Sequence, residues 1–293
     1  EPMSAVNGNN ELRELFVAER KEIERILAEL PAEAAARQES INLNYEMLVT
    51  LDCIFARAKL SFAMHGIEPV IRTDGKLELK HARHPLIDAK KVVPVSLSLG
   101  VDFDTMVITG PNTGGKTVTL KTIGLLTLMA ECGLHIPADD GSSIAIFETV
   151  LADIGDEQSI EQSLSTFSSH MRNIVEILQV CDRDSLILFD ELCAGTDPAE
   201  GAALAIALIE FCRKCGAKVA TTTHYAELKL YAMRTEGVIN ASCEFNVETL
   251  QPTYRLLIGI PGKSNAFAIS RRLGLDEKII EDAHSMVSQN DVN

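Results

Sequence analysis

Several features that define other protein classes are missing from this chain of 293 residues. No run of about 18 uninterrupted apolar residues occurs, so no membrane span is predicted. The opening residues, EPMSAVNGNN, lack the basic-then-apolar order of a signal peptide. No internal repeat or low-complexity segment is present, and the 46% hydrophobic and 24% charged composition excludes a largely disordered chain. We therefore expect a globular, cytoplasmic protein without a membrane partner.

Positive charge is scarce as well. The chain has 27 Lys and Arg residues against 42 Asp and Glu residues, a formal net charge of −15. Affinity for nucleic acid comes mainly from basic side chains that neutralise phosphates, so this balance argues against a protein that coats nucleic acid. A local basic patch, or a partner domain outside this chain, remains a route to nucleic-acid binding.

The seven cysteines are dispersed and odd in number, which predicts reduced thiols and no disulfide framework. Cys212 and Cys215 form one C-x-x-C pair. A structural zinc site usually needs a second ligand pair, and a thioredoxin-like redox motif needs a different strand context. We therefore interpret the pair as two buried or half-buried thiols on a helix.

Residues 1–65 carry two helical patterns. The first, over 11–30, has apolar residues at helical spacing, and Pro31 is predicted to end it. The second continues to about residue 64. Charged surfaces with narrow apolar stripes favour an antiparallel arm, with an ordinary helix pair packed on the next domain as the alternative. Because the chain starts abruptly within such an arm, we expect it to be an excised fragment.

Near residue 66 the sequence changes to short β-rich segments, and after Gly115 apolar strands alternate with helices. Strand–helix alternation predicts an α/β fold whose central, mostly parallel sheet is covered by helices. The predicted domains are therefore 1–65 (helical) and 66–293 (α/β). We expect strands at 106–109, 185–189 and 217–223, a strand pair near 238–258, and helices near 264–273 and 276–288.

The strongest motif is Gly110-Pro-Asn-Thr-Gly-Gly-Lys-Thr117, a full match to the phosphate-binding pattern G-x-x-x-x-G-K-[ST] between a strand and a helix over 115–131. Its glycines let backbone N–H groups turn around phosphate oxygens, and the helix N-terminus adds positive dipole. Lys116 is expected to reach the β- and γ-phosphates, and Thr117 to hold Mg²⁺. The predicted nucleotide-binding residues are Gly110, Pro111, Asn112, Thr113, Gly114, Gly115, Lys116, Thr117 and Val118.

A second glycine-rich segment, 259–264, resembles this motif but has two residues between its glycines where four are needed. We predict a loop there, with Ser264 as the N-cap of the next helix.

Two further strands end in residues that suit phosphate chemistry. Leu186-Ile-Leu-Phe precedes Asp190 and Glu191, and a strand after a phosphate-binding loop that ends this way predicts Mg²⁺ coordination by Asp190. Glu191 can align and deprotonate an attacking water, which favours hydrolysis over transfer to a substrate hydroxyl. The strand before His224 predicts a γ-phosphate sensor at that residue, with a structural histidine as the alternative. Asp197 either pairs across a subunit boundary or caps the helix that begins near Pro198.

Together these residues resemble the ATPase domain of the MutS family, within the wider ABC-type P-loop ATPases. The matching stretches are RHP at 83–85, GPNTGGKT, STF at 165–167, LFDEL, AGTDPAEG and TTTHYAEL. The segments DIGDEQSIEQSLSTFSSH and DELCAGTDPAEGAALA are most similar to the bacterial MutS paralogue that carries a C-terminal Smr nuclease domain. Residues 1–65 are similar to part of that family's core and lever helices.

The resemblance implies ATP as the nucleotide, Lys116, Glu191 and His224 as catalytic residues, and a homodimer that sandwiches ATP. Ser165 would contact the γ-phosphate bound by the opposite subunit, with a helix cap as the alternative, and Gln158 would order Mg²⁺ or water. Mismatch-repair members stack adenine on an aromatic side chain, but this chain has no aromatic residue around Val93-Pro94-Val95. It also lacks their mismatch-reading Phe-x-Glu domain.

The function implied is ATP hydrolysis coupled to a clamp on branched DNA, with suppression of recombination, or on stalled and collided ribosomes through rRNA. The Smr endonuclease lies outside this chain. Residues 106–293 hold 14 basic and 25 acidic residues, a net charge of −11, so we expect nucleic acid to bind mostly elsewhere in the parent protein. One alternative is a module whose ATP site only locks a dimer, without turnover. A small-molecule kinase is disfavoured, because no lid-like Arg cluster follows.

Overall fold

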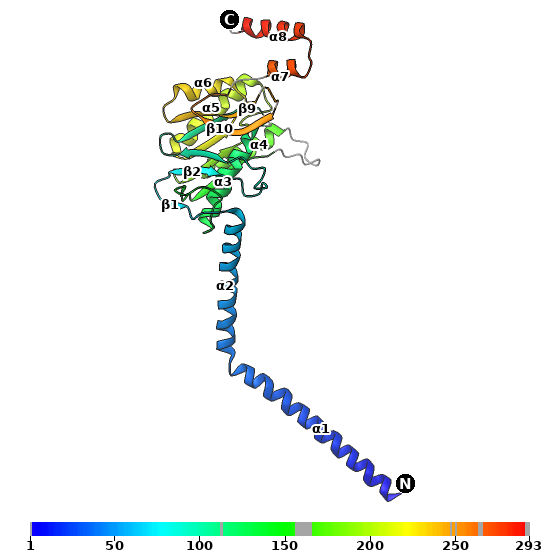
Figure 1. Cartoon of the computed structure of the whole chain (residues 1–293). Helices are drawn as coiled ribbons and strands as arrows, with labels where there is room; N and C mark the ends of the chain where they lie inside the picture. The colour runs from blue at the N-terminus through cyan, green and yellow to red at the C-terminus, as the bar shows by residue number, and fades with distance from the viewer. Residues whose placement is uncertain are drawn as a thin grey trace. The chain divides into compact units, whose positions relative to one another are not determined.

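The computed structural model describes residues 2–111, 114–155, 166–246, 248–249, 251–262 and 266–290. The chain divides into two units, Glu1–Lys59 and Leu60–Asn293. Helix α1 (Met3–Ala35) and most of α2 (Gln38–Met64) make up the first unit, and the strands β1–β10 with helices α3–α8 make up the second (Figure 1). The site residues predicted above all belong to the second unit.

The first unit corrects two expectations. Helix α1 does not end at Pro31 but continues to Ala35. Proline removes one backbone hydrogen bond, but the residues that follow it, AEAAA, are strong helix formers that sustain the last turn. No side chain of α1 or α2 is buried, and the two helices follow one another (Figure 1). The predicted antiparallel pair is therefore wrong, and the apolar stripes of both helices stay exposed.

The main sheet of the second unit has six strands in the order β10-β9-β4-β8-β7-β6. Its strands are β4 (Thr105–Thr109), β6 (Thr149–Asp153), β7 (Ser185–Phe189), β8 (Lys218–Thr222), β9 (Val238–Asn246) and β10 (Gln251–Ile258). All neighbours are parallel except β9 and β10, which pair antiparallel. The prediction of a mostly parallel central sheet is confirmed.

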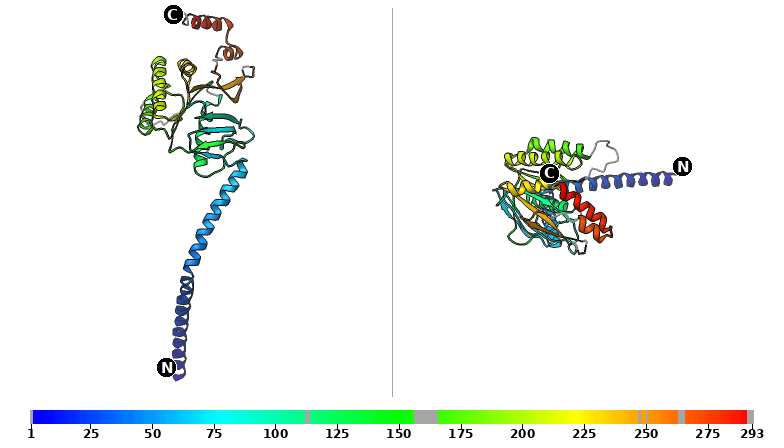
Figure 2. Two further views of the ribbon diagram at one scale, coloured as in Figure 1. Left: turned by 90° about the vertical axis from the view of Figure 1, so that its left-hand side faces the viewer. Right: turned by 90° about the horizontal axis from the view of Figure 1, so that it is seen from above.

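Every residue of the central strands β4 and β7 is buried, so both faces of this sheet are covered. Helices lie on each face. Met106 and Ile108 of β4 share a core with Leu120 and Ile123 of α3 (Lys116–Glu131). Val107, which points to the other face, belongs to the core formed with α4 (Thr166–Val180), α5 (Pro198–Cys215) and α6 (Ala226–Arg234). The strands are thus held between helical layers (Figure 2).

A second, four-stranded sheet has the order β1-β5-β2-β3. Its strands are β1 (Val70–Arg72), β2 (Leu77–Ala82), β3 (Val95–Leu99) and β5 (Ser143–Ala145). Alternate residues of β2 and β3, such as Leu79 and Leu97, are buried in the same core as α3. Helix α3 is therefore enclosed between the two sheets.

The chain continues with two short helices, α7 (Ala266–Arg272) and α8 (Glu277–Asn290), as predicted. The rings of Phe267 and His284 stack between them, with centroids 5.3 Å apart. Among the helices of the described residues, none has both the length and the apolar character that a bilayer crossing requires.

Candidate functional site

The predicted site residues come from three neighbouring parallel strands. β4 leads into Gly110, β7 into Asp190 and Glu191, and β8 toward His224. Because β4, β8 and β7 are adjacent and parallel, their carboxyl ends meet at one edge of the sheet. Ligands of open parallel sheets bind at this edge.

Lys116 lies at the centre of this edge, on the first turn of α3, and is only 1% exposed. Its Nζ lies 3.0 Å from the carbonyl oxygen of Gly110, 2.9 Å from Nε2 of His224 and 4.0 Å from a carboxylate oxygen of Glu191. Burial lowers the pKa of the Lys116 ammonium, and the carboxylates of Glu191 and Asp190 oppose that shift. A buried cation thus faces the loop at the start of α3.

Two glycines, Gly110 and Gly115, allow the backbone between β4 and α3 to adopt positive φ values. Gly110 and Gly115 have φ values of +137° and +94°. A Cβ at Gly110 would lie 3.1 Å from the carbonyl oxygen of Cys243, and one at Gly115 would lie 3.0 Å from the ring of Tyr254. Both positions therefore favour glycine, because other residues rarely adopt these φ values and a Cβ would crowd its neighbour. Pro111 accepts a hydrogen bond from the N–H of Gly114, at 2.9 Å.

Asp190 has both carboxylate oxygens fixed by hydroxyl groups. Thr117 Oγ1 donates to one oxygen and Thr222 Oγ1 to the other, each at 2.6 Å. The N–H of Asp190 donates to the carbonyl of Asp153, at 2.8 Å, which fixes the end of β7 against β6. A carboxylate and a hydroxyl in contact are hard oxygen donors of the kind Mg²⁺ takes, with substrate phosphates filling its other positions.

The described residues contain no cluster of three or more His, Cys, Asp or Glu side chains that could hold a metal ion. An all-protein metal centre is thus absent from the described part of the chain. The pair of Thr117 and Asp190 instead fits a cation that a bound phosphate helps to hold.

Glu191 projects beside this pair in an unusual backbone conformation, with φ of +49°. Its N–H donates to Oγ1 of Thr222, at 2.7 Å, and its Oε1 lies 3.0 Å from Nε2 of His224. The side chain is 39% exposed, so water can reach it. His224 Nε2 therefore lies between a carboxylate and the ammonium of Lys116, and it can hydrogen-bond to either one.

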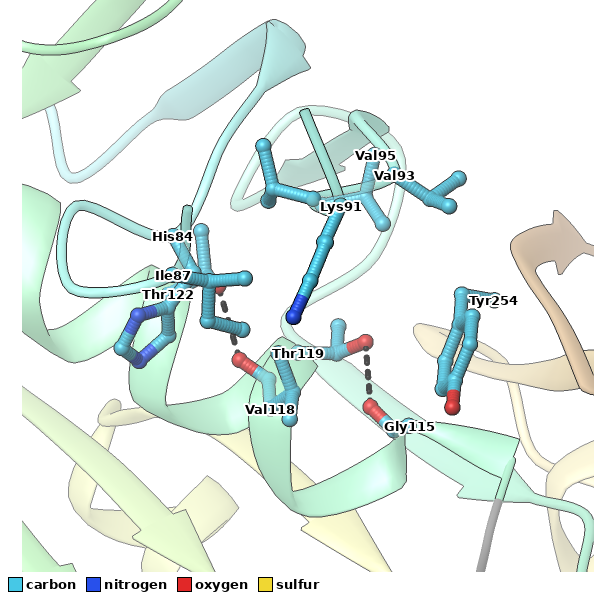
Figure 3. Close-up of a pocket in the computed structure, with 11 residues that line it drawn as sticks. His84, Ile87, Lys91, Val93, Val95, Gly115, Val118, Thr119, Thr122 and Tyr254 are labelled. Carbon is cyan, nitrogen blue, oxygen red and sulfur yellow. Dashed lines mark hydrogen bonds between the residues drawn. The ribbon is translucent and has the colours of Figure 1, made fainter. Parts of the chain in front are cut away.

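A cavity of about 330 Å³ opens beside the loop, next to the first turns of α3. Its walls are mainly apolar, with Val93, Val95 and Val118 among them, and His84 and Lys91 add polar groups. Figure 3 shows the ring of Tyr254 standing beside Gly115 on one side of the cavity. Burial, with Lys121 as a second cause, lowers the pKa of His84, which favours a neutral imidazole at this wall.

Tyr254 is the residue that reasoning from the sequence missed. The sequence has no aromatic residue around Val93, and the aromatic ring at this cavity comes from β10, far along the chain. Tyr254 has φ of +59° where the β9–β10 register shifts, and this irregularity turns its ring toward Gly115. No local sequence signal marks such a contact.

Other predicted residues have simpler outcomes. Asp197 caps α5, since its side chain accepts from the N–H groups of Ala199 and Glu200 at 3.0 and 3.1 Å. The capping interpretation is confirmed. Asn112, Thr113, Gln158, Ser165 and Ser264 lie outside the described residues.

The loop interpretation of residues 259–264 holds over its described part, 259–262. The N–H of Gly262 donates to Oγ1 of Thr109, at 2.8 Å, so the loop lies against the last residue of β4. The sequence did not indicate that these two glycine-rich segments touch.

The C-x-x-C pair lies on α5, as expected, with Cys212 buried and Cys215 half-buried. Burial raises the pKa of the Cys212 thiol to about 11. A thiol with a raised pKa stays protonated near neutral pH and reacts slowly, which agrees with structural thiols.

Comparison with known proteins identifies the family. Residues 106–291 match the family model of MutS domain V. The chain belongs to the MutS family. This confirms the resemblance drawn from the motifs, and the match runs from β4 to the C-terminal helices.

Individual MutS-family relatives are similar over the whole chain. It is 63% identical over 293 residues to a protein of Agathobacter rectalis named Endonuclease MutS2. It is 59% identical over 292 residues to proteins of the same name from Acetivibrio thermocellus and Clostridioides difficile. Each alignment covers 100% of this chain but 37% of the relative. The chain thus spans about 37% of the length of these relatives.

Proposed function

We propose that residues 66–293 form an ABC-type P-loop ATPase domain that binds ATP with Mg²⁺ and hydrolyses it. The observation that carries this proposal is the convergence of Lys116, Thr117, Asp190, Glu191 and His224 at one edge of the sheet. The glycine loop and the N-terminus of α3 provide backbone N–H groups for the phosphates. The buried cation of Lys116 adds positive charge beside them.

Thr117 and Asp190 would hold the magnesium ion. Bound there, Mg²⁺ would neutralise phosphate charge. Thr222 would keep Asp190 in orientation, because it donates to the oxygen that Thr117 does not occupy. One carboxylate oxygen of Asp190 would thus lie at the metal beside Thr117, and the other would stay hydrogen-bonded to Thr222 of β8.

Glu191 would act as the general base toward a water molecule. Its exposed carboxylate is anchored through its own N–H to Thr222, which fixes its position relative to Asp190. The Nε2 of His224 lies near both Glu191 and Lys116, so it would donate either to the Glu191 carboxylate or, when nucleotide is bound, to the γ-phosphate. A base held within reach of water suits hydrolysis better than transfer to a second substrate.

The alternative function is a binding module whose ATP site locks a dimer without hydrolysing ATP. The two are separated by phosphate release from the purified chain under saturating ATP and Mg²⁺. Multiple turnovers per chain would support the ATPase. Tight ATP binding with no release beyond a single equivalent would instead favour the binding module.

The cavity beside Gly115 is proposed to bind the adenine base. Tyr254 would stack on the base, and Val93 and Val118 would pack around it. We predict that Tyr254→Ala weakens ATP binding about 5- to 150-fold, because stacking of a base on an aromatic ring contributes about 1–3 kcal/mol. Tyr254→Phe should bind ATP as the parent does, since it keeps the ring. Isothermal titration calorimetry measures both.

The same titrations with inorganic tripolyphosphate provide the control for this prediction. Tyr254→Ala should bind tripolyphosphate as tightly as the parent, because the phosphate loop is unchanged. An equal loss for ATP and tripolyphosphate would show that Tyr254 supports the loop at Gly115 and does not bind the base.

We further propose that the domain works as a homodimer, with Ser165 of each subunit completing the site of the other. Chains of Ser165→Arg and Lys116→Ala should each be inactive, whereas their mixture should recover part of the parent's ATPase rate. Only the mixed dimer contains one site that carries neither lesion. ATP should also promote dimerisation, measured by light scattering. ATP-bound chains that stay monomeric, with activity independent of concentration, would contradict the shared site.

At the level of the parent protein, we propose that nucleotide state is coupled to a clamp on branched DNA or on stalled ribosomes. The relatives are named endonucleases, and the chain covers 37% of their length. From the resemblance to the Smr-bearing paralogue, we propose that nuclease activity belongs to a Smr domain of the parent protein. The net charge of −11 over residues 106–293 supports nucleic-acid contacts mostly outside this region. Co-sedimentation of the full-length parent with ribosomes and with four-way junctions tests the choice.

A further inference from the structure

The turn that carries Glu191 has an unusual backbone. Glu191 and Cys193 both have positive φ values, +49° and +59°, although neither is glycine. Residues with a Cβ seldom adopt such values, and they keep them only where surrounding contacts hold the backbone. The contacts that hold this turn therefore decide where the carboxylate of Glu191 lies.

Strand β8 holds the first half of the turn. The N–H of Glu191 donates to Oγ1 of Thr222, at 2.7 Å, and the N–H of Leu192 donates to the carbonyl of the same threonine, at 3.2 Å. Within the turn, the N–H of Ala194 donates to the carbonyl of Glu191, at 2.9 Å. The carbonyl of Cys193 receives its hydrogen bond from a different segment.

Tyr225 supplies that hydrogen bond. Its hydroxyl donates to the carbonyl oxygen of Cys193, at 2.7 Å, and its N–H donates to Oγ1 of Thr223, at 3.0 Å. Burial is the main cause that raises the pKa of the Tyr225 phenol, so it stays protonated and able to donate near neutral pH. Tyr225 directly follows His224, whose Nε2 lies 3.0 Å from Oε1 of Glu191. Two successive residues thus contact the turn, one at its carboxylate and one at its backbone.

Helix α5 has a glycine where the phenol lies. A Cβ at Gly201 would lie 2.9 Å from Cζ of Tyr225 and 3.0 Å from the carbonyl oxygen of Cys193. Gly201 is helical and its φ is not positive, so it suits this position by its size. Any larger side chain there would displace the phenol, the carbonyl or both.

We infer that Tyr225 is a positioning residue, whose hydroxyl holds the turn 191–194 in the conformation that places the Glu191 carboxylate beside His224. This inference rests on the proposed function, because it takes Glu191 as the general base. Glu191, His224 and Tyr225 line one cavity of about 240 Å³, which is large enough for water. A shift of the turn moves the carboxylate within that space. Without the hydroxyl, ATP should bind as before and be cleaved more slowly.

Tyr225→Phe removes the hydroxyl alone and is the first test. Single-turnover cleavage of ATP with Mg²⁺ should slow about 10- to 100-fold, because a misplacement of about 1 Å can cost about 100-fold in rate. Calorimetry should show the parent's affinity for the non-hydrolysable analogue AMP-PNP with Mg²⁺. The loss is therefore expected in the cleavage step and not in binding.

Tyr231→Phe is the matched control, since it removes one hydroxyl from the same helix, α6. The Tyr231 hydroxyl donates to Glu210, which also pairs with Arg213. Arg213 in turn binds Asp104, directly before β4 and thus at the opposite end of that strand from Gly110. Tyr231→Phe should cleave ATP at the parent's rate.

Gly201→Ala tests the same contact without changing the tyrosine. Its Cβ should displace the phenol from the carbonyl of Cys193 and slow cleavage, although alanine is the better helix former. Adding Tyr225→Phe to Gly201→Ala should slow cleavage little further, because both changes break one hydrogen bond.

Combination with Glu191→Gln separates positioning from general support of the fold. If Tyr225 acts through the Glu191 carboxylate, Tyr225→Phe should leave the residual rate of Glu191→Gln unchanged. Equal slowing in both backgrounds, or cleavage at the parent's rate by Tyr225→Phe and Gly201→Ala, would overturn the inference alone. A parent chain that cleaves no ATP, or Glu191→Gln that cleaves it at the parent's rate, would instead overturn the proposed function and the inference with it.

Discussion

Glu191→Gln is expected to lower ATP turnover by about 10²–10⁴-fold while ATP still binds, because glutamine keeps the size and hydrogen bonding of the side chain but cannot accept a proton from water. The geometry sharpens this expectation. Glu191 is anchored through its backbone N–H to Thr222, so the amide side chain should keep the same position near His224. Steady-state phosphate release measures turnover, and calorimetry measures binding.

A matched control is available on the neighbouring helix. Glu200 is an exposed carboxylate in the first turn of α5, and Glu200→Gln should leave turnover unchanged. If Glu191→Gln instead loses ATP binding with its fold intact, Glu191 supports the structure of the site, and another residue is the base.

The second large effect is expected at Lys116. Lys116→Ala should reduce turnover about a hundred- to thousandfold, because it removes a charge-assisted contact that strengthens as charge develops on the transferred phosphate. The side chain is 1% exposed, so its contact with a phosphate is screened little by solvent. Its loss also leaves His224 and Glu191 without their shared cation. Phosphate release under saturating ATP is the measurement.

Lys214→Ala is the control for this variant, since Lys214 is an exposed lysine in the last turn of α5. It should hydrolyse ATP at the parent's rate. Hydrolysis at the parent's rate by Lys116→Ala would show that the loop 110–117 is not the phosphate-binding element.

The sequence predicted correctly the positions of the site residues that directly follow neighbouring strands. The loop before Lys116, the pair Asp190–Glu191 and His224 each follow a strand with a recognisable apolar run. Adjacent parallel strands have their carboxyl ends at the same edge of the sheet, so no other information is needed to place these residues together. The positions of these side chains at one sheet edge were therefore predictable, although their roles remain proposals.

Contacts between distant segments were not predictable. Tyr254 reaches Gly115 through a register shift in β10, and Arg83 reaches the end of α2 from the small sheet. Both depend on how separate sheets are packed, which no periodicity reports. Pro31 shows the opposite failure: a strong local signal for a helix end was outweighed by the alanine-rich residues after it.

The central claim is that this sheet edge is a hydrolytic ATP site, and a single-turnover reaction tests it most directly. The chain is mixed in excess with ATP labelled in its γ-phosphate, with Mg²⁺, and bound nucleotide is sampled over time. The account predicts that the parent converts bound ATP to ADP and free phosphate, whereas Glu191→Gln binds the same amount and keeps it intact. Bound ATP that stays intact in the parent, or is cleaved equally fast by Glu191→Gln, would contradict it.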